Sequence, residues 1–237
     1  RAAQPDLQWT TFEGVSIPVP PAEHPRLYLR AHDIPDLRRR TTHPVLQPVW
    51  DKMQAAAKND PAGAVEVDAI RYLLARDAGL GRRTAAAALK LLQETKIDMS
   101  SQNTDYWVTP TRGRLMVSGA VVYDWCYPVL TAEQKKAYVE QFLRLARSLE
   151  CGYPPPKVGG VTGHYSEWML MRDILSAGVA IYDEFPEMYQ VAANRFFGLF
   201  VPVRNWWYQG HAFHQGSSYA ETRAGSEMYP LWIFERL

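Results

Sequence analysis

The feature that most constrains this chain is the lack of convincing period-two alternation between apolar and polar residues. Such alternation marks half-buried strands, whereas apolar residues spaced three and four apart mark amphipathic helices. Helical segments follow one another with short connections, which favours antiparallel helix pairs. The sequence therefore predicts an all-α fold. The predicted helices are residues 34–40, 45–58, 65–76, 82–96, 111–127, 132–150, 164–184, 187–208 and 221–237.

The predicted helices are of two kinds. The helix at 132–150 is amphipathic, whereas the segments 117–127 and 169–181 are apolar on most sides. A helix buried all round beside an amphipathic one fits an inner ring of helices inside an outer ring. An α-solenoid and a plain bundle are the alternatives. Thr131 and Gln134 form the pattern of a capping box, which predicts a helix start at residue 132.

The two ends of the chain are unlike its middle. Residues 1–25 are rich in proline and are predicted as an extended arm without regular structure, followed by the helical domain at 26–237. The chain has neither an initiator Met nor an apolar signal core, so we expect it to be processed or cropped. The segment 227–237 is apolar and ends without a polar tail, which predicts a domain truncated at its C-terminus.

Charge and hydropathy narrow the classes of function. The chain carries 26 Lys and Arg against 25 Asp and Glu, a net charge of +1, which argues against a general nucleic-acid binder. A local basic cleft is compatible with this balance. No run of eighteen apolar residues is present, so no membrane span is expected. Cys126 and Cys151 fall at opposite ends of a predicted helical hairpin, so two free, buried thiols are expected.

Three connections stand out by composition. Residues 98–110, 151–163 and 209–218 are long, polar and rich in Gly, Pro and aromatic residues. Binding and catalytic sites of helical domains are usually built from such loops. We therefore expect the functional residues in these loops and at the starts of the helices that follow them.

Two pairs of polar residues follow the second and third loops. His164 and Glu167 are three residues apart, and Tyr219 and Arg223 are four apart, so each pair shares a helix face. A guanidinium beside a tyrosine favours the phenolate, which makes Tyr219 a candidate general base or acid. Ordinary packing of the Tyr–Arg pair and a buried structural histidine are the alternatives.

The histidines also raise the question of a metal. His211 with His214, and His164 with Glu167, offer two ligands each. A zinc site needs three or four protein ligands in a recognisable pattern. Because no such pattern is present, no metal or other cofactor is expected in this chain.

Two stretches of the chain resemble the heparinase II/III-like polysaccharide lyases, and within that family its heparinase II branch. One is the segment 24–38, which reads HPRLYLR followed by DIPDLR. The other is the loop and helix at 213–229 with its Gly-x-x-Tyr core, paired with GHYSE at 163–167. The resemblance covers most of residues 24–237. It implies an incomplete α/α toroid, followed in the complete protein by antiparallel β-sandwich domains.

The resemblance also implies a reaction, which is β-elimination at uronic acids of heparin and heparan sulfate. It gives Tyr219 the role of abstracting and donating protons, with His164 beside it, and Glu167 the role of neutralising the uronate carboxylate. A further histidine and a structural zinc are implied in the missing β-sandwich, so the chain alone is not expected to be a complete enzyme. The expected substrate-binding residues are Arg223, His214, Gln215, His211, Lys157 and Trp107. Further candidates for a cationic wall are Arg112, Arg114 and Arg204.

Other functions remain open at this point. A lyase for alginate or another uronate polymer is one, although His164 in place of an asparagine counts against it. A helical scaffold that binds glycans without cleaving them is another. An inverting glycoside hydrolase needs two carboxylates, and only Glu167 and Glu221 stand near the loops. The resemblance implies a periplasmic or secreted bacterial protein whose partner is the polysaccharide, and a homodimer is a further expectation.

Overall fold

The computed structural model describes residues 7–97, 105–149, 153, 169–211, 216 and 225–237. These residues are mostly helical, as predicted. The helices are η1 (Ala31–Asp33), α1 (Ile34–Thr42), α2 (Gln47–Ala57), α3 (Pro61–Ala75), α4 (Ala78–Glu94), α5 (Asp105–Trp125), η2 (Tyr127–Val129), α6 (Ala132–Arg147), η3 (Met169–Ile174), α8 (Leu175–Ala180), α9 (Pro186–Arg195), η4 (Phe196–Phe200), α10 (Val201–Trp207), η5 (Tyr208–Gly210) and α12 (Gly225–Arg236).

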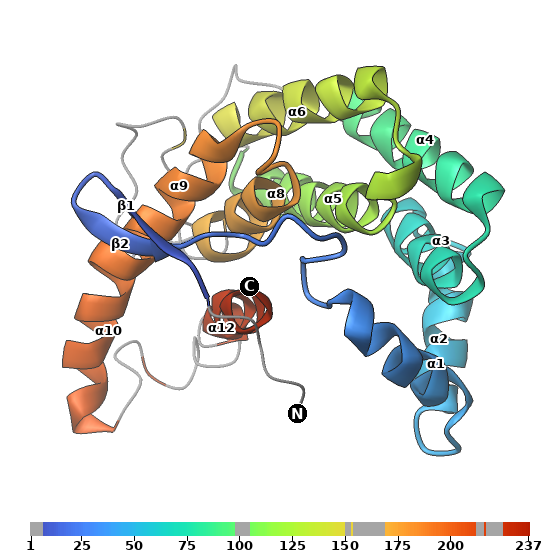
Figure 1. The fold of residues 1–237 in the computed structure, drawn as a ribbon, viewed down its shortest axis with the longest axis horizontal. Coiled ribbons are helices and arrows are strands. Elements are labelled where there is room, and N and C mark those ends of the chain that lie inside the picture. The colour runs from blue at the N-terminus through green and yellow to red at the C-terminus, as the bar shows by residue number, and fades with distance from the viewer. Residues whose placement is uncertain (1–6, 98–104, 150–152, 154–168, 212–215, 217–224) are drawn as a thin grey trace.

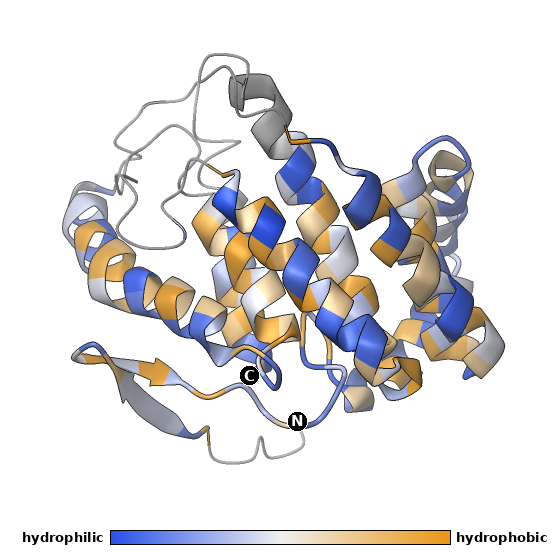
Figure 2. Ribbon diagram, turned by 90° about the horizontal axis from the view of Figure 1, so that it is seen from above, coloured by the Kyte–Doolittle hydropathy of each residue, from blue (hydrophilic) through white to orange (hydrophobic). Residues whose placement is uncertain are grey.

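The helices form an arc around a central pair (Figure 1). Helices α5 and α8 pack against each other on the inside, and α3, α4, α6 and α9 cover them from outside. Hydrophobic and hydrophilic residues both occur along the helices (Figure 2). The prediction of apolar inner helices beside amphipathic outer ones is therefore confirmed for α5, α8 and α6.

The core shows why the two kinds of helix differ. On α6, the residues Tyr138, Phe142 and Leu145 are fully buried and lie on one face at three- and four-residue spacing. On α5, Met116 and Tyr123 are fully buried as well. The buried hydroxyl of Tyr138 donates a 2.7 Å hydrogen bond to the backbone carbonyl of Ala85, which satisfies it.

The residues at which several helices begin are explained by the capping residues that precede them. The capping box before α6 is confirmed, because Thr131 Oγ1 accepts from the Gln134 amide and Gln134 Oε1 accepts from the Thr131 amide. Helices α3 and α4 begin four residues earlier than predicted, at Pro61 and Ala78. In each case an aspartate caps the free amides, Asp60 for α3 and Asp77 for α4.

The N-terminal arm contains a β-hairpin, so the prediction of no regular structure there is wrong. Strands β1 (Trp9–Phe12) and β2 (Val15–Pro18) pair antiparallel. Glu13 and Gly14 between them both have positive φ, 47° and 79°, as a type I′ turn requires. The hairpin packs on α9 and η4, and Asn194 on α9 donates a 2.8 Å hydrogen bond to the Phe12 carbonyl.

Two helices predicted as continuous contain π-helical turns. The turn η3 precedes α8, and η4 separates α9 from α10. A π turn widens the helix by one residue per turn and often lies at functional sites. The turn η3 carries Arg172, which lines the cavity described below.

Candidate functional site

A cavity of about 490 Å³ lies between α12 and the α1–α3 side of the arc, with α5 along its wall. Sequence periodicity explains the wall. Arg114, Val117 and Trp125 on α5 face the cavity at helical spacing, as do Tyr229, Trp232 and Arg236 on α12. The cavity arginines are Arg40, Arg114, Arg172 and Arg236, and the cavity aromatic residues are Tyr28, Trp125, Tyr229 and Trp232.

Arg114 makes a two-pronged ion pair with Glu66 on α3. Its Nη2 lies 2.8 Å from Glu66 Oε2, and its Nη1 contacts Glu66 Oε1. Ser118, one turn further along α5, donates a 2.7 Å hydrogen bond to the same Oε1. A planar guanidinium held at two points is oriented as well as neutralised.

Two more cavity arginines pair with acids near the start of α1. Nε of Arg40 lies 2.7 Å from Oδ2 of Asp36, and Nη1 of Arg236 lies 3.5 Å from Oδ2 of Asp33. The hydrogen bond from Arg40 lowers the pKa of Asp36 below its ordinary value. Asp36 therefore faces the cavity as a carboxylate at neutral pH.

The fourth cavity arginine pairs with its sequence neighbour. Nε of Arg172 donates a 2.6 Å hydrogen bond to Oδ1 of Asp173, whose carboxyl is buried. Burial raises the pKa of Asp173, while Arg172 acts in the opposite direction. Among the described residues no hydrogen-bond partner reaches Asp173 Oδ2. That oxygen packs against Gly113 of α5, where any side chain would overlap it.

The cavity aromatic residues form a connected group. The rings of Tyr28 and Trp232 are 5.0 Å apart, and the Arg172 guanidinium lies 5.7 Å from the centre of the Tyr229 ring. The Tyr28 hydroxyl is 2.7 Å from Ser176 Oγ, and burial raises the pKa of Tyr28. Tyr28 is therefore a protonated, fixed ring at neutral pH and not a base.

The cavity holds groups that suit a sugar. Aromatic faces offer apolar contact area, and guanidinium and carboxylate groups offer donors and acceptors for hydroxyls. A largely apolar pocket with a few oriented polar groups is the usual form of a small-molecule site.

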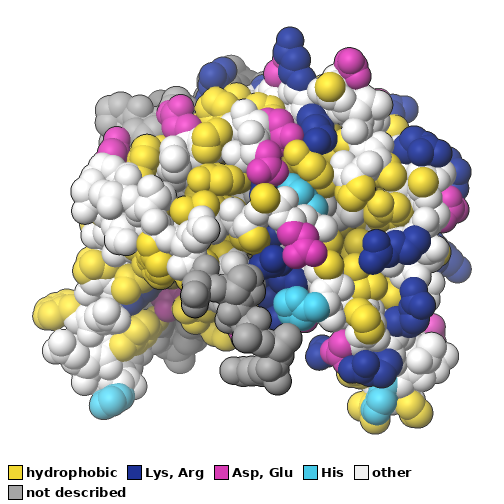
Figure 3. Space-filling view, viewed as in Figure 1, with side chains coloured by type: hydrophobic (Ala, Val, Ile, Leu, Met, Phe, Trp, Pro, Cys, Tyr) yellow, Lys and Arg dark blue, Asp and Glu magenta, His cyan; other side chains and the backbone are white. Residues whose placement is uncertain are grey.

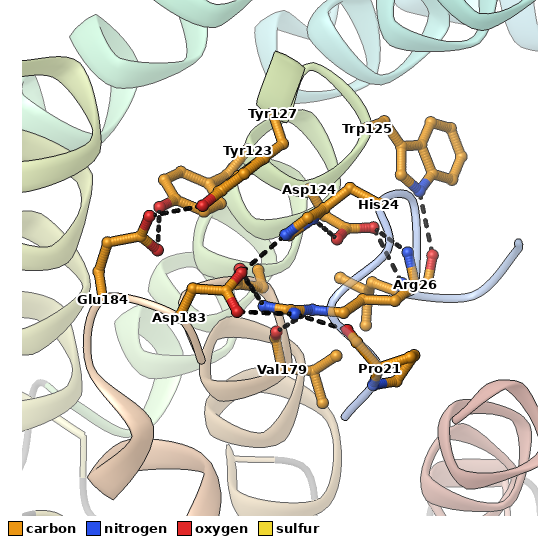
Figure 4. A network of polar contacts seen from close by, with 12 residues as sticks. Pro21, His24, Arg26, Tyr123, Asp124, Trp125, Tyr127, Val179, Asp183 and Glu184 are labelled. Atoms are coloured by element: carbon orange, nitrogen blue, oxygen red, sulfur yellow. Dashed lines mark hydrogen bonds and ion pairs between the residues drawn. The ribbon is translucent and has the colours of Figure 1, made fainter. Parts of the chain in front are cut away.

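A group of polar residues, here named the N-terminal clamp, fixes the segment that brings Tyr28 to the cavity (Figure 4). It consists of His24, Arg26, Asp124 and Asp183. His24 Nδ1 lies 2.6 Å from Asp124 Oδ1, and His24 Nε2 lies 2.9 Å from Asp183 Oδ2. Asp124 Oδ2 also accepts 2.9 Å hydrogen bonds from the backbone amides of Arg26 and Leu27.

Arg26 in the clamp is fully buried and caps the end of α8. Its Nε donates to the Val179 carbonyl at 3.0 Å and its Nη2 to the Ala180 carbonyl at 3.3 Å. These carbonyls belong to the last turn of α8, where backbone acceptors lack partners inside the helix. Trp125 Nε1 donates a 3.0 Å hydrogen bond to the Leu27 carbonyl, which also links the segment to the cavity wall.

One side of the clamp is covered by an aromatic stack. The His24 and Tyr127 rings are parallel, with centres 3.7 Å apart, and Lys135 Nζ lies 3.4 Å from the Tyr127 ring centre. Glu184 accepts hydrogen bonds of 2.6 and 2.8 Å from Tyr123 and Tyr127. The HPRLYLR segment therefore has a structural role, since it ties the ends of α5 and α8 together.

Most residues that the sequence singled out lie outside the described part of the chain. Trp107 lies on α5, but its side chain is outside the description. His211 is described: it ends η5 in a left-handed conformation with φ 53°, is exposed, and does not line the cavity. The site residues outside the description are His164, Glu167, Tyr219, Arg223, His214, Gln215 and Lys157.

The three candidate wall cations have different environments. Arg114 lines the cavity, where it is paired with Glu66. Arg112 is buried, and buried Arg204 pairs with Glu227 at 2.6 Å and lies over the Phe200 ring. The expectation that Arg112 and Arg204 form an exposed cationic wall is therefore wrong, because both guanidinium groups lie inside the packed helices.

Sequence reasoning missed most of the cavity. Tyr28, Arg172, Tyr229 and Trp232 come from segments that are distant in the chain, and none lies in the loops that drew attention. A usable signal was present on α12, where aromatic and basic residues recur at helical spacing on an otherwise apolar helix. The basic residues on that face of α12 need polar surroundings, and a cavity provides them.

Some expectations about metals, membranes and thiols can be compared with the described residues. In that part of the chain no group of three His, Cys, Asp or Glu side chains is placed to hold a metal, and no helix has the length and apolarity of a membrane span. His164, Glu167 and His214 lie outside it, so the expected absence of a metal stays a prediction. Cys126 is free and buried, and burial raises the pKa of its thiol to about 12. Cys151 lies outside the description.

The cavity therefore combines four paired arginines with four aromatic rings on helices held by the N-terminal clamp. The family suggested by the sequence remains a hypothesis. No model of a known protein family matches the chain, and no curated protein matches it significantly.

Proposed function

We propose that this chain is the helical domain of a polysaccharide lyase that cleaves heparin and heparan sulfate by β-elimination. In this proposal the arc of helices is part of an α/α toroid. The resemblance of the segments around residues 24–38, 163–167 and 213–229 suggests the family, and the cavity offers aromatic rings and hydrogen-bonding groups that suit a sugar ring.

One observation carries the proposal. Three elements that line the cavity are each the continuation of one of the three loops singled out in the sequence. Helix α5 begins at Asp105, so residues 105–110 of the segment predicted as a loop are helical; η3 follows 151–163 in the sequence, and α12 follows 209–218. The residues of the two sequence motifs come shortly before η3 and α12 in the chain, and both of these elements line the cavity.

Positive charge on the α1–α4 side of the molecule supports an anionic ligand. Lys and Arg side chains lie along the α1–α4 side of the molecule (Figure 3). In these four helices Lys and Arg outnumber Asp and Glu. A surplus of one sign beside a cavity raises the local concentration of oppositely charged ligand. The near-zero net charge of the chain is therefore compatible with a polyanionic partner.

The proposed reaction starts at C5 of a uronate. Removing the C5 proton builds negative charge on the adjoining carboxylate, which Glu167 in its protonated form or a nearby arginine stabilises. Tyr219 removes the proton, with His164 beside it, or returns one to the leaving O4. The products are a free 4-hydroxyl and a chain end with a double bond between C4 and C5.

The experiment follows the double bond. The intact protein is incubated with heparin, heparan sulfate and alginate, and the ultraviolet absorbance of unsaturated uronate is recorded together with the reducing ends. Absorbance from heparin or heparan sulfate supports the proposal, and absorbance from alginate alone favours the uronate-polymer alternative. Reducing ends without absorbance indicate a hydrolase, and binding with neither signal indicates a glycan-binding scaffold.

Three further expectations go with this proposal. The protein acts in the periplasm or outside a bacterial cell, where its polymer is found. A structural zinc and a further histidine belong to the β-sandwich that the resemblance implies. A homodimer is the third, and sedimentation of the intact protein tests it.

A further inference from the structure

We propose that the cavity binds an uncharged, unsulfated sugar ring of the glycan chain. This inference rests on the proposed function, because it names the sugar chemistry that the proposed lyase takes. It concerns a site on α1, α3, α5, η3 and α12 and not the residues of the predicted catalytic loops.

Every arginine that lines the cavity is paired with an acid. Each cavity arginine has a carboxyl group within 3.5 Å, and three of these four carboxyl groups line the cavity themselves. An anionic sulfate that approached a cavity arginine would also approach its acid, and the two charge interactions would oppose each other. The cavity is rich in charged groups without being a cationic site. The pairs are Arg40 with Asp36, Arg114 with Glu66, Arg172 with Asp173 and Arg236 with Asp33.

The type of hydrogen bond that the cavity acids make also favours a hydroxyl. The paired carboxylate oxygens of Asp33, Asp36 and Glu66 accept hydrogen bonds from arginines, and a sugar hydroxyl can donate to such oxygens as well. A sulfate ester only accepts, so replacing a hydroxyl by a sulfate leaves acceptor facing acceptor. A site built to bind a hydroxyl discriminates strongly against an analogue that lacks the donor.

The rim of the cavity is apolar and aromatic. Trp232 is half exposed and Met53 is 43% exposed, and both line the cavity beside the buried ring of Tyr28. Apolar and aromatic surface packs against the C–H face of a pyranose ring and gives a charged substituent nothing to bind. Cations outside the cavity, along α1–α4, attract the polyanionic chain, whereas the cavity selects one uncharged ring within it.

The test compares two tetrasaccharides of equal length by isothermal titration calorimetry. Both alternate uronate with hexosamine; one carries N-acetyl groups and no sulfate, and the other carries N- and O-sulfates on the hexosamine. We expect the unsulfated tetrasaccharide to bind at least about tenfold more tightly, a ratio that corresponds to about 1.4 kcal/mol.

Variants link the preference to the cavity. Asp36→Asn and Glu66→Gln remove one charge each and should reduce the ratio by about threefold or more, because the paired arginine is released to the sulfate. Asp68→Asn is the matched control, since Asp68 pairs with Arg71 at 2.9 Å on α3 and does not line the cavity. Thermal unfolding of each variant confirms that it is folded before titration.

Three results would overturn the inference: equal or tighter binding of the sulfated tetrasaccharide, no binding of either, or a ratio unchanged in both cavity variants. The proposed function fails by a different readout, which is the lack of unsaturated product from every uronate polymer. A lyase with a preference for sulfated rings would therefore contradict the inference and leave the proposed function standing.

Discussion

Nδ1 of His24 lies 2.6 Å from Oδ1 of Asp124, so a segment near the N-terminus is tied to the end of α5 a hundred residues later. The same carboxylate holds the amides of Arg26 and Leu27. One buried acid thus determines the path of the chain just before Tyr28 enters the cavity wall. This contact therefore links the stability of the N-terminal segment to the shape of the cavity.

Removing the imidazole should weaken the whole domain. His24→Ala takes away the partner of two carboxylates, of which that of Asp124 is fully buried. Taking a hydrogen-bond partner away from a buried carboxylate costs about 1–3 kcal/mol, and we expect a loss of that size in the free energy of unfolding, measured in urea. His32→Ala is the control, because His32 is exposed and 3.6 Å from Asp33. An equal effect of the two variants would show that the clamp contributes nothing specific.

The clamp should also shape the response to acid. Burial alone would raise the pKa of Asp183, but the hydrogen bonds from His24 and Arg26 outweigh it and lower the pKa. A carboxylate with a lowered pKa stabilises the fold above its unfolded value of about 3.9, and this stabilisation is lost as the pH falls further. We expect Asp183→Asn to be less stable at pH 7.

Unfolding measured at a series of pH values checks whether the ionised Asp183 carboxylate stabilises the fold. Between pH 7 and the acid range below about 4, the wild-type protein should lose more stability than Asp183→Asn does. Asp51→Asn, a change at an exposed residue of α2, is the comparison. A steeper loss in Asp183→Asn than in the wild-type protein would mean that the sign assigned to Asp183 is wrong.

Helices α8 and α9 approach closely at one glycine. A Cβ at Gly178 would lie 2.6 Å from the backbone nitrogen of Tyr189 and 2.7 Å from its Cα. Because backbone atoms cannot rotate away, we expect Gly178→Ala to lower the free energy of unfolding by about 1–3 kcal/mol. Gly210→Ala, where a Cβ meets nothing within 4 Å, should change it by less than about 0.5 kcal/mol. A neutral Gly178→Ala would mean that the two helices can separate at no cost.

The aromatic rim should matter for ligand binding more than for stability. Trp232 is half exposed on α12 and lines the cavity, whereas Trp206 on α10 is 69% exposed and does not. We expect Trp232→Ala to weaken binding of the unsulfated tetrasaccharide by about tenfold, and Trp206→Ala to leave it unchanged. Calorimetry measures both. Similar affinities of the two variants for the tetrasaccharide would mean that the cavity does not bind the glycan.

The fold was predictable to the extent that it depends on periodicity. The burial of Tyr138 and Phe142 follows from spacing along a single helix, as does the position of Arg114 beside Val117. The early start of α3 was missed although Asp60 and Pro61 are a recognisable cap and first-turn pair.

What periodicity cannot give is contact between distant segments. The β-hairpin was missed because strands of four residues are too short to show alternation and Glu13–Gly14 is not among the commonest turn pairs. The cavity was missed because Tyr28, Arg172 and Trp232 meet only through the packing of η3 and α12. The catalytic roles proposed for His164, Glu167 and Tyr219 come from the resemblance alone. Measurements of activity test these roles.

The most direct measurement is the ultraviolet absorbance produced from heparan sulfate by the intact protein and by Tyr219→Phe, with binding of the same glycan measured in parallel. Loss of one hydroxyl removes the proposed acid and base while leaving the ring. We predict that the wild-type protein generates unsaturated uronate and that Tyr219→Phe binds with nearly the same affinity but gives no product. Full activity of Tyr219→Phe, or no unsaturated product from the wild-type protein with any uronate polymer, would contradict the proposal.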